Sequence, residues 1–208
     1  SFSMPSGQVA MNELSNHDHS RFLTRTNHKV GRTNTLGPQA AEQGINKAVF
    51  REGVVIQMTW TGAPTIYYGD EAGVCGFTDP DNRRTYPWGH EDQVLLAFHK
   101  DIIRLRRENE ELRSGSLKML ESDYNFISYG RFNRKGQCAV LINNNNHPIT
   151  KEIHVWEIGT PKTGKMKVIL QSRDDGYCME GAEYEIKAGK ILIEMPQTSA
   201  TILKFIEE

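Results

Sequence analysis

The run Asn-His-Asp-His-Ser-Arg at residues 16–21 gathers side chains that are suited to chemistry. It follows residues 8–15, whose pattern predicts a strand. The carboxyl end of a parallel strand is where functional groups project in barrels and open α/β sheets. A His, a carboxylate and an Arg can together hold a polyhydroxylated ligand and bias charge around a developing cation. The competing interpretation is a polar turn with a capping Asp.

A metal site at the same place is disfavoured by spacing. His17 and His19 share one side of an extended segment, whereas Asp18 opposes them. The sequence has no further His or Cys cluster to complete a ligand shell. The sequence therefore predicts neither a bound metal nor a cofactor.

Two later runs also combine polar and aromatic residues. Residues 62–71 read as a buried strand that ends in a polar loop, where Asp70 or Glu71 can line a cleft, although packing of the strand's tyrosines is the simpler interpretation. Residues 79–88 hold Asp79, Arg83 and Trp88 in one loop. They fit either a sugar platform or an ordered loop that is pinned by an Asp–Arg pair and two prolines.

The character of the chain changes near residue 113. Before it, helical periodicity predicts helices over residues 38–60 and 91–107, with a short strand over 65–68 and loops over 24–37 and 69–90. A strand–helix–strand–helix order implies parallel strands with crossovers and therefore an α/β class. Two such units cannot close a barrel, and they leave exposed strand edges.

The remainder of the chain predicts an antiparallel β-sandwich. Short strand patterns, separated by turn clusters, occur at 126–132, 138–143, 153–158, 165–171, 184–186, 190–195 and 200–206. Trp156, Tyr177 and Tyr184 are typical of a sandwich core, with sugar binding as the alternative.

Composition excludes several functional classes. The chain has 208 residues, a formal net charge of −1 and no long apolar run, which argues against nucleic-acid and membrane partners. The N-terminal stretch lacks the pattern of a signal peptide. Three cysteines without a CxxC pair, and the absence of an Asn-x-Ser/Thr sequon, favour a cytoplasmic location.

The three runs, in this order, resemble glycoside hydrolase family 13, the α-amylase family. The likeness is strongest to its neopullulanase, cyclomaltodextrinase and maltogenic amylase branch. Residues 15–22 (SNHDHSRF) resemble the family's fourth conserved region at the end of barrel strand seven. Residues 62–73 (GAPTIYYGDEAG) resemble strand eight and its loop. Residues 79–88 and the following helix resemble the approach to helix eight and its body.

The resemblance implies a domain organisation and site roles. Residues 1–113 would form the last part of a TIM (β/α)8 barrel, with strands and helices seven and eight, and residues 114–208 a C-terminal β-sandwich. Asp18 would stabilise the transition state of a retaining hydrolysis of α-1,4-glucosidic bonds in starch-derived oligosaccharides, cyclodextrins or pullulan. His17, Arg21, Asp79 and Arg83 would bind or support the α-glucan.

The same resemblance implies that the chain by itself is inactive. In the family, the nucleophile and the acid/base carboxylate belong to earlier barrel strands, and we expect them to lie upstream of residue 1. We also expect self-association, or pairing with the missing part of the barrel. A non-catalytic carbohydrate-binding or assembly module is the alternative function. Exposed tryptophans on one sheet face would favour that alternative, and a buried Trp156 would count against it.

Overall fold

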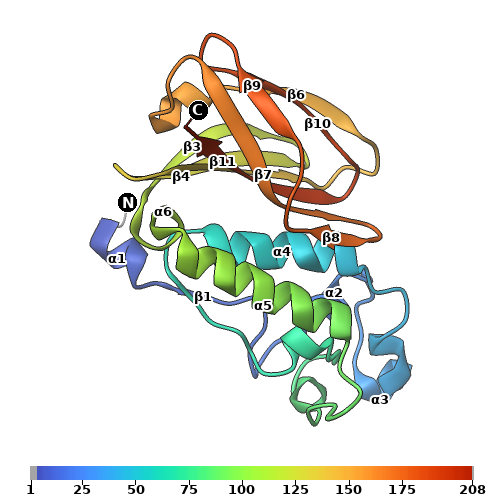
Figure 1. Cartoon of the computed structure of the whole chain (residues 1–208). Helices are drawn as coiled ribbons and strands as arrows, with labels where there is room; N and C mark the ends of the chain where they lie inside the picture. Colours follow the sequence, from blue (N-terminus) through green and yellow to red (C-terminus); the bar gives the residue numbers. More distant parts are fainter. Residues whose placement is uncertain (1–3, 208) are drawn as a thin grey trace.

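The computed structural model describes residues 4–207 as successive layers of helices, a large sheet and a small sheet (Figure 1). The first three residues of the N-terminal stretch, and Glu208, lie outside the described residues. Elements before residue 115 supply the helices and one short parallel strand pair. Elements after it supply the antiparallel sheets. The combination of an α/β part with an all-β part confirms the predicted fold class.

Two short strands in the first part, β1 (Met11–Asn12) and β2 (Ala63–Pro64), pair in parallel as predicted. The predicted strand limits were wrong. Residues 4–8 form the short helix α1 (Met4–Gln8), and the strand predicted over 65–68 is displaced toward the N-terminus. Tyr67 and Tyr68 leave the sheet because their rings, and the carbonyl of Tyr68, contact a buried arginine instead of a neighbouring strand.

The predicted helix over 38–60 is interrupted. It divides into the 3-10 turn η1 (Pro38–Ala41) and the helix α4 (Lys47–Thr59). Asn46 begins α4 because its side-chain oxygen accepts hydrogen bonds from the backbone of Ala48 at 2.9 Å and Val49 at 3.1 Å. The predicted loop over 24–37 contains helical turns, since α2 spans Phe22–Arg25 and α3 spans Thr33–Leu36.

The second predicted long helix is confirmed as α5 (Gln93–Glu108), and a further short helix, α6 (Glu110–Ser114), follows it. Asp92 caps α5 by accepting from the backbone of Val94 and Leu95. The loop before α5 carries two 3-10 turns, η2 (Asp70–Ala72) and η3 (Asp81–Arg83). Within residues 4–207, no helix has the length and apolar character that crossing a membrane requires.

The second part is an antiparallel sandwich of unequal sheets. The large sheet has the order β3-β4-β5-β11-β7-β8, with β9 also paired to β7, and the small sheet pairs β6 with β10. The strands are β3 (Ser116–Asp123), β4 (Phe126–Phe132), β5 (Gln137–Asn143), β6 (Ile149–Ile153), β7 (Gly164–Arg173), β8 (Gly176–Cys178), β9 (Glu183–Ile186), β10 (Ile191–Met195) and β11 (Ser199–Ile206).

Most predicted sandwich strands are confirmed to within two residues. The strand predicted over 153–158 was wrong, because β6 ends at Ile153 and a 3-10 turn, η4 (Val155–Ile158), follows it. Strands β3 and β8 were not predicted. Much of β3 is partly exposed and carries charged residues, so its apolar alternation is weak.

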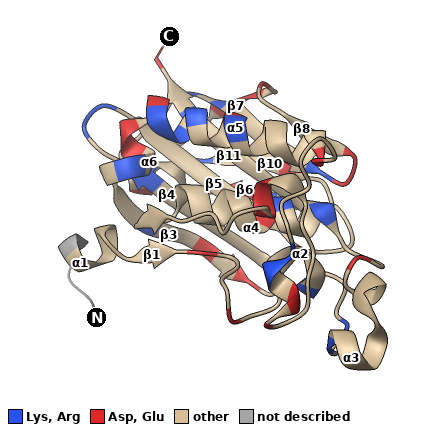
Figure 2. Cartoon of the chain, turned by 90° about the horizontal axis from the view of Figure 1, so that it is seen from below, with Lys and Arg blue, Asp and Glu red and all other residues tan. Residues whose placement is uncertain are grey.

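Two cores hold the layers together. One lies between the helices and the large sheet and includes Phe50, Val54, Phe98 and Ile202. The other lies between the two sheets and includes Ile193. Each fully buried side chain of this kind contributes about 1.5–3 kcal/mol relative to exposure. Figure 2 shows charged residues on α5, α6 and the loops, whereas the ribbon of the central strands is almost uncharged.

Two arginines donate to carbonyls at the carboxyl end of α4, and the buried Arg131 joins the two parts there. Arg131 of β4 donates to the carbonyls of Thr59 and, at 3.0 Å, of Gly115. Arg106 of α5 donates to the carbonyls of Met58 at 2.7 Å and of Gly62 at 2.9 Å. The bonds to Met58 and Thr59 satisfy carbonyls of the last turn of α4 and place positive charge at the negative end of its dipole.

Candidate functional site

Asp18 projects from the loop that follows β1. Its side chain is 67% exposed, and its Oδ1 lies 3.4 Å from Nε2 of His17, which is similarly exposed. The two side chains therefore lie together on one accessible patch in the loop after β1. The prediction that Asp18 points away from His17 was wrong, because residues 17–19 form a bend and not an extended segment. An exposed carboxylate beside an imidazole can accept hydrogen bonds from hydroxyl groups and stabilise nearby positive charge.

The backbone that carries Asp18 is held from within its own loop and from a second loop. The side-chain oxygen of Asn16 accepts from the backbone of Asp18 at 3.0 Å and of His19 at 3.1 Å. The hydroxyl of Thr78 donates to the carbonyl of Asp18 at 2.7 Å. The exposed carboxylate is thus mounted on a backbone whose polar groups already have partners.

Asn82, in η3, packs beneath the loop that carries Asp18 and hydrogen-bonds to its backbone. Its side chain is fully buried, and its Nδ2 donates to the carbonyls of Asn16 at 3.1 Å and of His19 at 2.8 Å. It thereby bridges the two ends of the turn that presents Asp18. The buried Oδ1 of Asn82 has no hydrogen-bond partner within residues 4–207.

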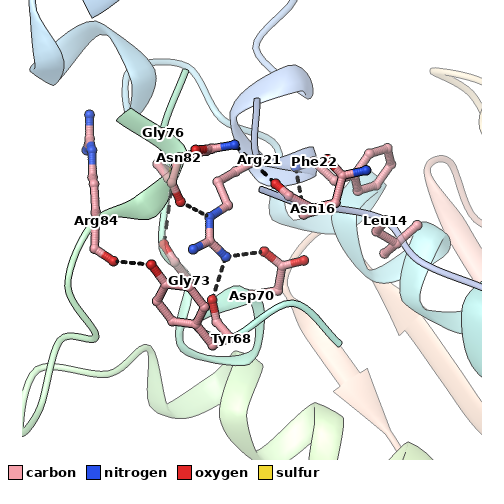
Figure 3. A network of polar contacts seen from close by, with 12 residues as sticks. Leu14, Asn16, Arg21, Phe22, Tyr68, Asp70, Gly73, Gly76, Asn82 and Arg84 are labelled. Carbon is pink, nitrogen blue, oxygen red and sulfur yellow. Dashed lines mark hydrogen bonds and ion pairs between the residues drawn. The ribbon is translucent and has the colours of Figure 1, made fainter. Parts of the chain in front are cut away.

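Arg21 is the centre of the network in Figure 3. Its side chain is completely buried, with Nε donating to the carbonyl of Asn82 at 2.8 Å and Nη1 donating to the carbonyl of Tyr68 and to Oδ1 of Asp70 at 3.0 Å. The guanidinium also lies 4.1 Å from the ring centre of Tyr67. Burial raises the pKa of the Asp70 carboxyl, against the opposing effect of its hydrogen bonds, including the one from Arg21.

These contacts change the role predicted for Arg21. A fully buried guanidinium cannot touch a ligand at the surface of this structure, so Arg21 is a positioning residue and not a ligand-binding one. The hypothesis that Asp70 lines a cleft is wrong for the same reason, because its carboxylate is buried against Arg21. Together the pair connects the loop after β1 to the loop after β2.

Asp79 and Arg83 form an ion pair between Oδ1 and Nε, with each side chain 49% exposed. They line a groove of about 510 Å³, together with Arg32, Asp81, Arg84 and other residues of the same two loops. Thr78 also lines this groove and bonds to the backbone of Asp18, so the groove and the carboxylate belong to connected loops.

Aromatic groups lie further along the same loop. The rings of Tyr86 and Trp88 are 4.5 Å apart between centres, and Trp88 is 80% exposed. The predicted sugar platform at Trp88 therefore has an accessible ring. Arg84 stabilises the loop by bonding to Asp81 at 2.9 Å and to Glu42 at 2.7 Å. Both readings of residues 79–88, an ordered loop and a sugar platform, are compatible with these contacts.

Thr78 and Asn82 were not predicted as site residues. Asn82 lies within residues 79–88, and nothing in its local sequence distinguishes it from the charged residues beside it. Both residues act across about 60 positions of sequence, on the backbone of another loop. No local pattern encodes such a contact.

Comparison with known proteins places this geometry in a family. Residues 2–91 match the model described as "Alpha amylase, catalytic domain", and residues 118–206 match "Alpha amylase, C-terminal all-beta domain". The chain belongs to the α-amylase family. The first match includes the Asp18 loop and the groove, and the second includes almost all of the sandwich.

Individual α-amylase-family relatives match nearly the whole chain. An amylopullulanase from Thermoanaerobacter thermohydrosulfuricus is 31% identical over 97% of this chain, which spans 14% of that protein. Neopullulanase 2 from Thermoactinomyces vulgaris is 32% identical over 94% of this chain, which spans 29% of that protein. An Anoxybacillus α-amylase structure superposes with a TM-score of 0.75 at 24% identity, covering 97% of this chain and 39% of its own. The chain thus corresponds to a minor part of these enzymes' length.

Proposed function

We propose that this chain supplies the transition-state-stabilising carboxylate, Asp18, to a retaining glycosidase that hydrolyses α-1,4-glucosidic bonds in starch-derived oligosaccharides, cyclodextrins or pullulan. The observation that carries the proposal is the exposed Asp18 carboxylate on a loop whose backbone is fixed by Asn16, Thr78 and Asn82. The names of the relatives, amylopullulanase and neopullulanase, support the class of substrate.

The chemistry follows from the charge that develops in such a reaction. Cleavage passes through an oxocarbenium-like transition state, and a fixed carboxylate stabilises that positive charge without reorganising. In the proposal, Asp18 and His17 hydrogen-bond sugar hydroxyls at the cleavage point. Asp79 and Arg83 bind glucose units further along the groove, and Arg21 positions the loop from beneath.

The proposal assigns the nucleophile and the acid/base carboxylate to other regions of the family's barrel, so the chain alone is inactive. The test measures new reducing ends from maltoheptaose and a cyclodextrin. The chain is assayed alone, and then mixed with a cyclomaltodextrinase barrel portion that lacks the two final strands. We expect no activity alone, activity on mixing, and loss of that activity with Asp18→Asn.

Activity of the isolated chain that survives Asp18→Asn and repurification from a glycosidase-free host would overturn the proposal. The carboxylates at Asp70, Glu71 and Asp79 would then need a new assignment. If both pieces fold and associate but the mixture releases no reducing ends, the result would count against Asp18 as the carboxylate that this chain supplies.

Self-association, or pairing with the rest of a barrel, is the second part of the proposal. β1 and β2 form a two-stranded parallel sheet, and Met11 of β1 is largely exposed. Parallel sheets are normally covered on both faces, and an open strand edge favours pairing with another chain. A monomer at every concentration in sedimentation would contradict self-association. The cytoplasmic location inferred from the cysteines stays a prediction.

A carbohydrate-binding role for the sandwich is the alternative, and Trp156 is the observation that bears on it. Its side chain is 50% exposed, but it lies in η4 and not on a sheet face. Retardation of the chain in amylose-containing native gels, abolished by Trp156→Ala, would support this alternative. Unchanged migration would favour a purely structural sandwich.

A further inference from the structure

A pocket of about 280 Å³ lies where α4 meets the turn between β3 and β4. Its helical side consists of Val49, Glu52, Gly53 and Ile56. These positions are spaced i, i+3, i+4 and i+7, so they form one face of the helix. None of the Asp18-loop or groove residues lines this pocket, and the glycosidase proposal makes no use of it.

Glu52 is the unusual member of that face. The residue is only 4% exposed, and its Oε1 is buried without a hydrogen-bond partner within residues 4–207. A buried carboxyl oxygen that lacks a partner is costly, because desolvation is not compensated. Burial, and secondarily the nearby Asp174, raise the pKa of Glu52 to about 8.

Most of the remaining lining is apolar. Phe22, Ile127 and Ile142 supply the apolar surface. Asn125, Asn144 and Asp123 are the polar members. No Lys or Arg is among the described residues that line the pocket.

The cationic side chains near the pocket, Arg51 and Lys151, bond to groups other than Glu52. The neighbouring Arg51 donates to the carbonyls of Arg173 and Asp174 and not to Glu52. Lys151 bonds to Glu121 and Asp123 and lies over the ring of Phe126, 4.9 Å from its centre. Among the described residues, no Lys or Arg pairs with Glu52, and the charge that acts on it is that of Asp174.

We propose that this pocket binds an organic cation, an ammonium or guanidinium group on a short apolar stem. The cation pairs with Glu52, and the stem packs against Phe22 and Ile127. The unpartnered Oε1 accepts a hydrogen bond from the cation, and the apolar side chains cover the methylene groups. A free amine and the Lys or Arg side chain of a polypeptide both carry this chemistry.

The test is an NMR titration of the full chain with n-butylguanidinium chloride, following backbone amide shifts of residues 47–59 and 126–127. We expect saturation with a Kd on the order of millimolar at pH 9, as befits so small a ligand. A guanidinium stays charged throughout this range, whereas Glu52 must ionise to pair with it. Binding should therefore weaken about tenfold at pH 7.

Three controls test whether binding depends on the charge of Glu52 or only on the apolar surface of the pocket. Glu52 is mostly uncharged at pH 7, and Gln has a similar shape, so the Glu52→Gln variant should fold. We expect this variant to show no saturable binding of n-butylguanidinium. Asp123→Asn removes only the rim charge and should change the Kd by less than about threefold. n-Pentanol, with a similar stem and no charge, should not saturate the wild-type chain.

Equal binding of n-butylguanidinium to wild type and Glu52→Gln would overturn the proposal, as would the absence of binding at pH 9. A parallel titration with Nα-acetyl-arginine N-methylamide distinguishes the two sources. Saturation by both compounds assigns the pocket to a polypeptide side chain. Saturation by n-butylguanidinium alone assigns it to a free cation, because the backbone then does not fit.

Discussion

Arg21 and Asp70 form a salt bridge of 3.0 Å in which the two side chains are 0% and 5% exposed. Removing charges from water costs several kcal/mol per ion, so such a pair adds little net stability compared with well-packed apolar residues. Its geometric effect is specific, because it ties the loop after β1 to the loop after β2 and, through the carbonyl of Asn82, to η3. The loop that presents Asp18 is thereby held to the two others.

Arg21→Ala should destabilise the chain by about 3–5 kcal/mol, because it leaves the Asp70 carboxylate buried without its partner. Urea unfolding followed by circular dichroism measures the change. Arg83→Ala is the matched control. Its ion pair with Asp79 is half-exposed, so we expect a loss of at most about 1 kcal/mol. Equal losses in the two variants would contradict the role given to Arg21.

Asn82→Ala should loosen the Asp18 loop. It removes two hydrogen bonds to the carbonyls of Asn16 and His19, at a cost of about 1–3 kcal/mol. Hydrogen exchange of residues 16–20 should accelerate more than that of α5. Asn146→Ala, at an exposed position, should leave the exchange unchanged. Unaltered exchange in Asn82→Ala would mean that Thr78 and Asn16 suffice to hold the loop.

Asp18→Asn should separate stability from function. The side chain is two-thirds exposed, so the free energy of unfolding should change by no more than about 0.5 kcal/mol. The activity of the reconstituted enzyme should fall by roughly 10²–10³-fold or more, because a fixed charge at the transition state is lost. A large loss of stability would assign Asp18 a structural role instead.

Glu52 should make the chain less stable as the pH rises. Its pKa in the folded chain is raised to about 8 from an ordinary 4.5, so between these values the folded state binds more protons than the unfolded state. The free energy of unfolding should therefore fall by a few kcal/mol from pH 4.5 to pH 8 and then level off.

Denaturant titrations of wild type and Glu52→Gln across that range provide the measurement. The variant lacks the titrating group, so its stability should depend less on pH and should exceed that of wild type above pH 8. Parallel pH profiles of the two proteins would show that Glu52 titrates normally.

Arg131→Met should weaken the junction between the helices and the sandwich by about 2–3 kcal/mol, since the carbonyls of Thr59 and Gly115 lose a charged donor. Arg134→Met, in the exposed turn after β4, is the control and should be nearly neutral. The two parts should also unfold less cooperatively in Arg131→Met, which would appear as separate transitions of tryptophan fluorescence and far-ultraviolet dichroism.

Sequence reasoning succeeded where the information is local. The apolar stripe of α5, with Leu95, Phe98 and Ile102, has helical spacing, and the alternation of Ile191, Ile193 and Met195 has strand spacing. Both predictions are confirmed because the periodically spaced apolar residues are the ones that are buried in the core. The ordered runs that resemble the α-amylase family were read from the sequence in the same way and are confirmed.

The predicted limits of a strand and a helix were wrong where a contact with a residue distant in sequence determines the local structure. Tyr67 and Tyr68 have strand-forming side chains, but Arg21 draws them out of the sheet. The helix predicted from residue 38 breaks before Asn46, whose side chain caps α4 and whose backbone donates to Thr26 at 2.7 Å. In both cases a tertiary hydrogen bond or ring contact outweighs a weak local preference.

The sequence by itself determined the family, the α/β-then-β organisation and the candidacy of Asp18, because these depend on residue types and their order along the chain. Only the tertiary structure decided that Arg21 is buried, that Asn82 and Thr78 hold the loop, and that Glu52 has no partner. Burial and hydrogen-bond pairing depend on which segments meet in space. These contacts join residues that are dozens of positions apart, so no periodic pattern in the sequence predicts them.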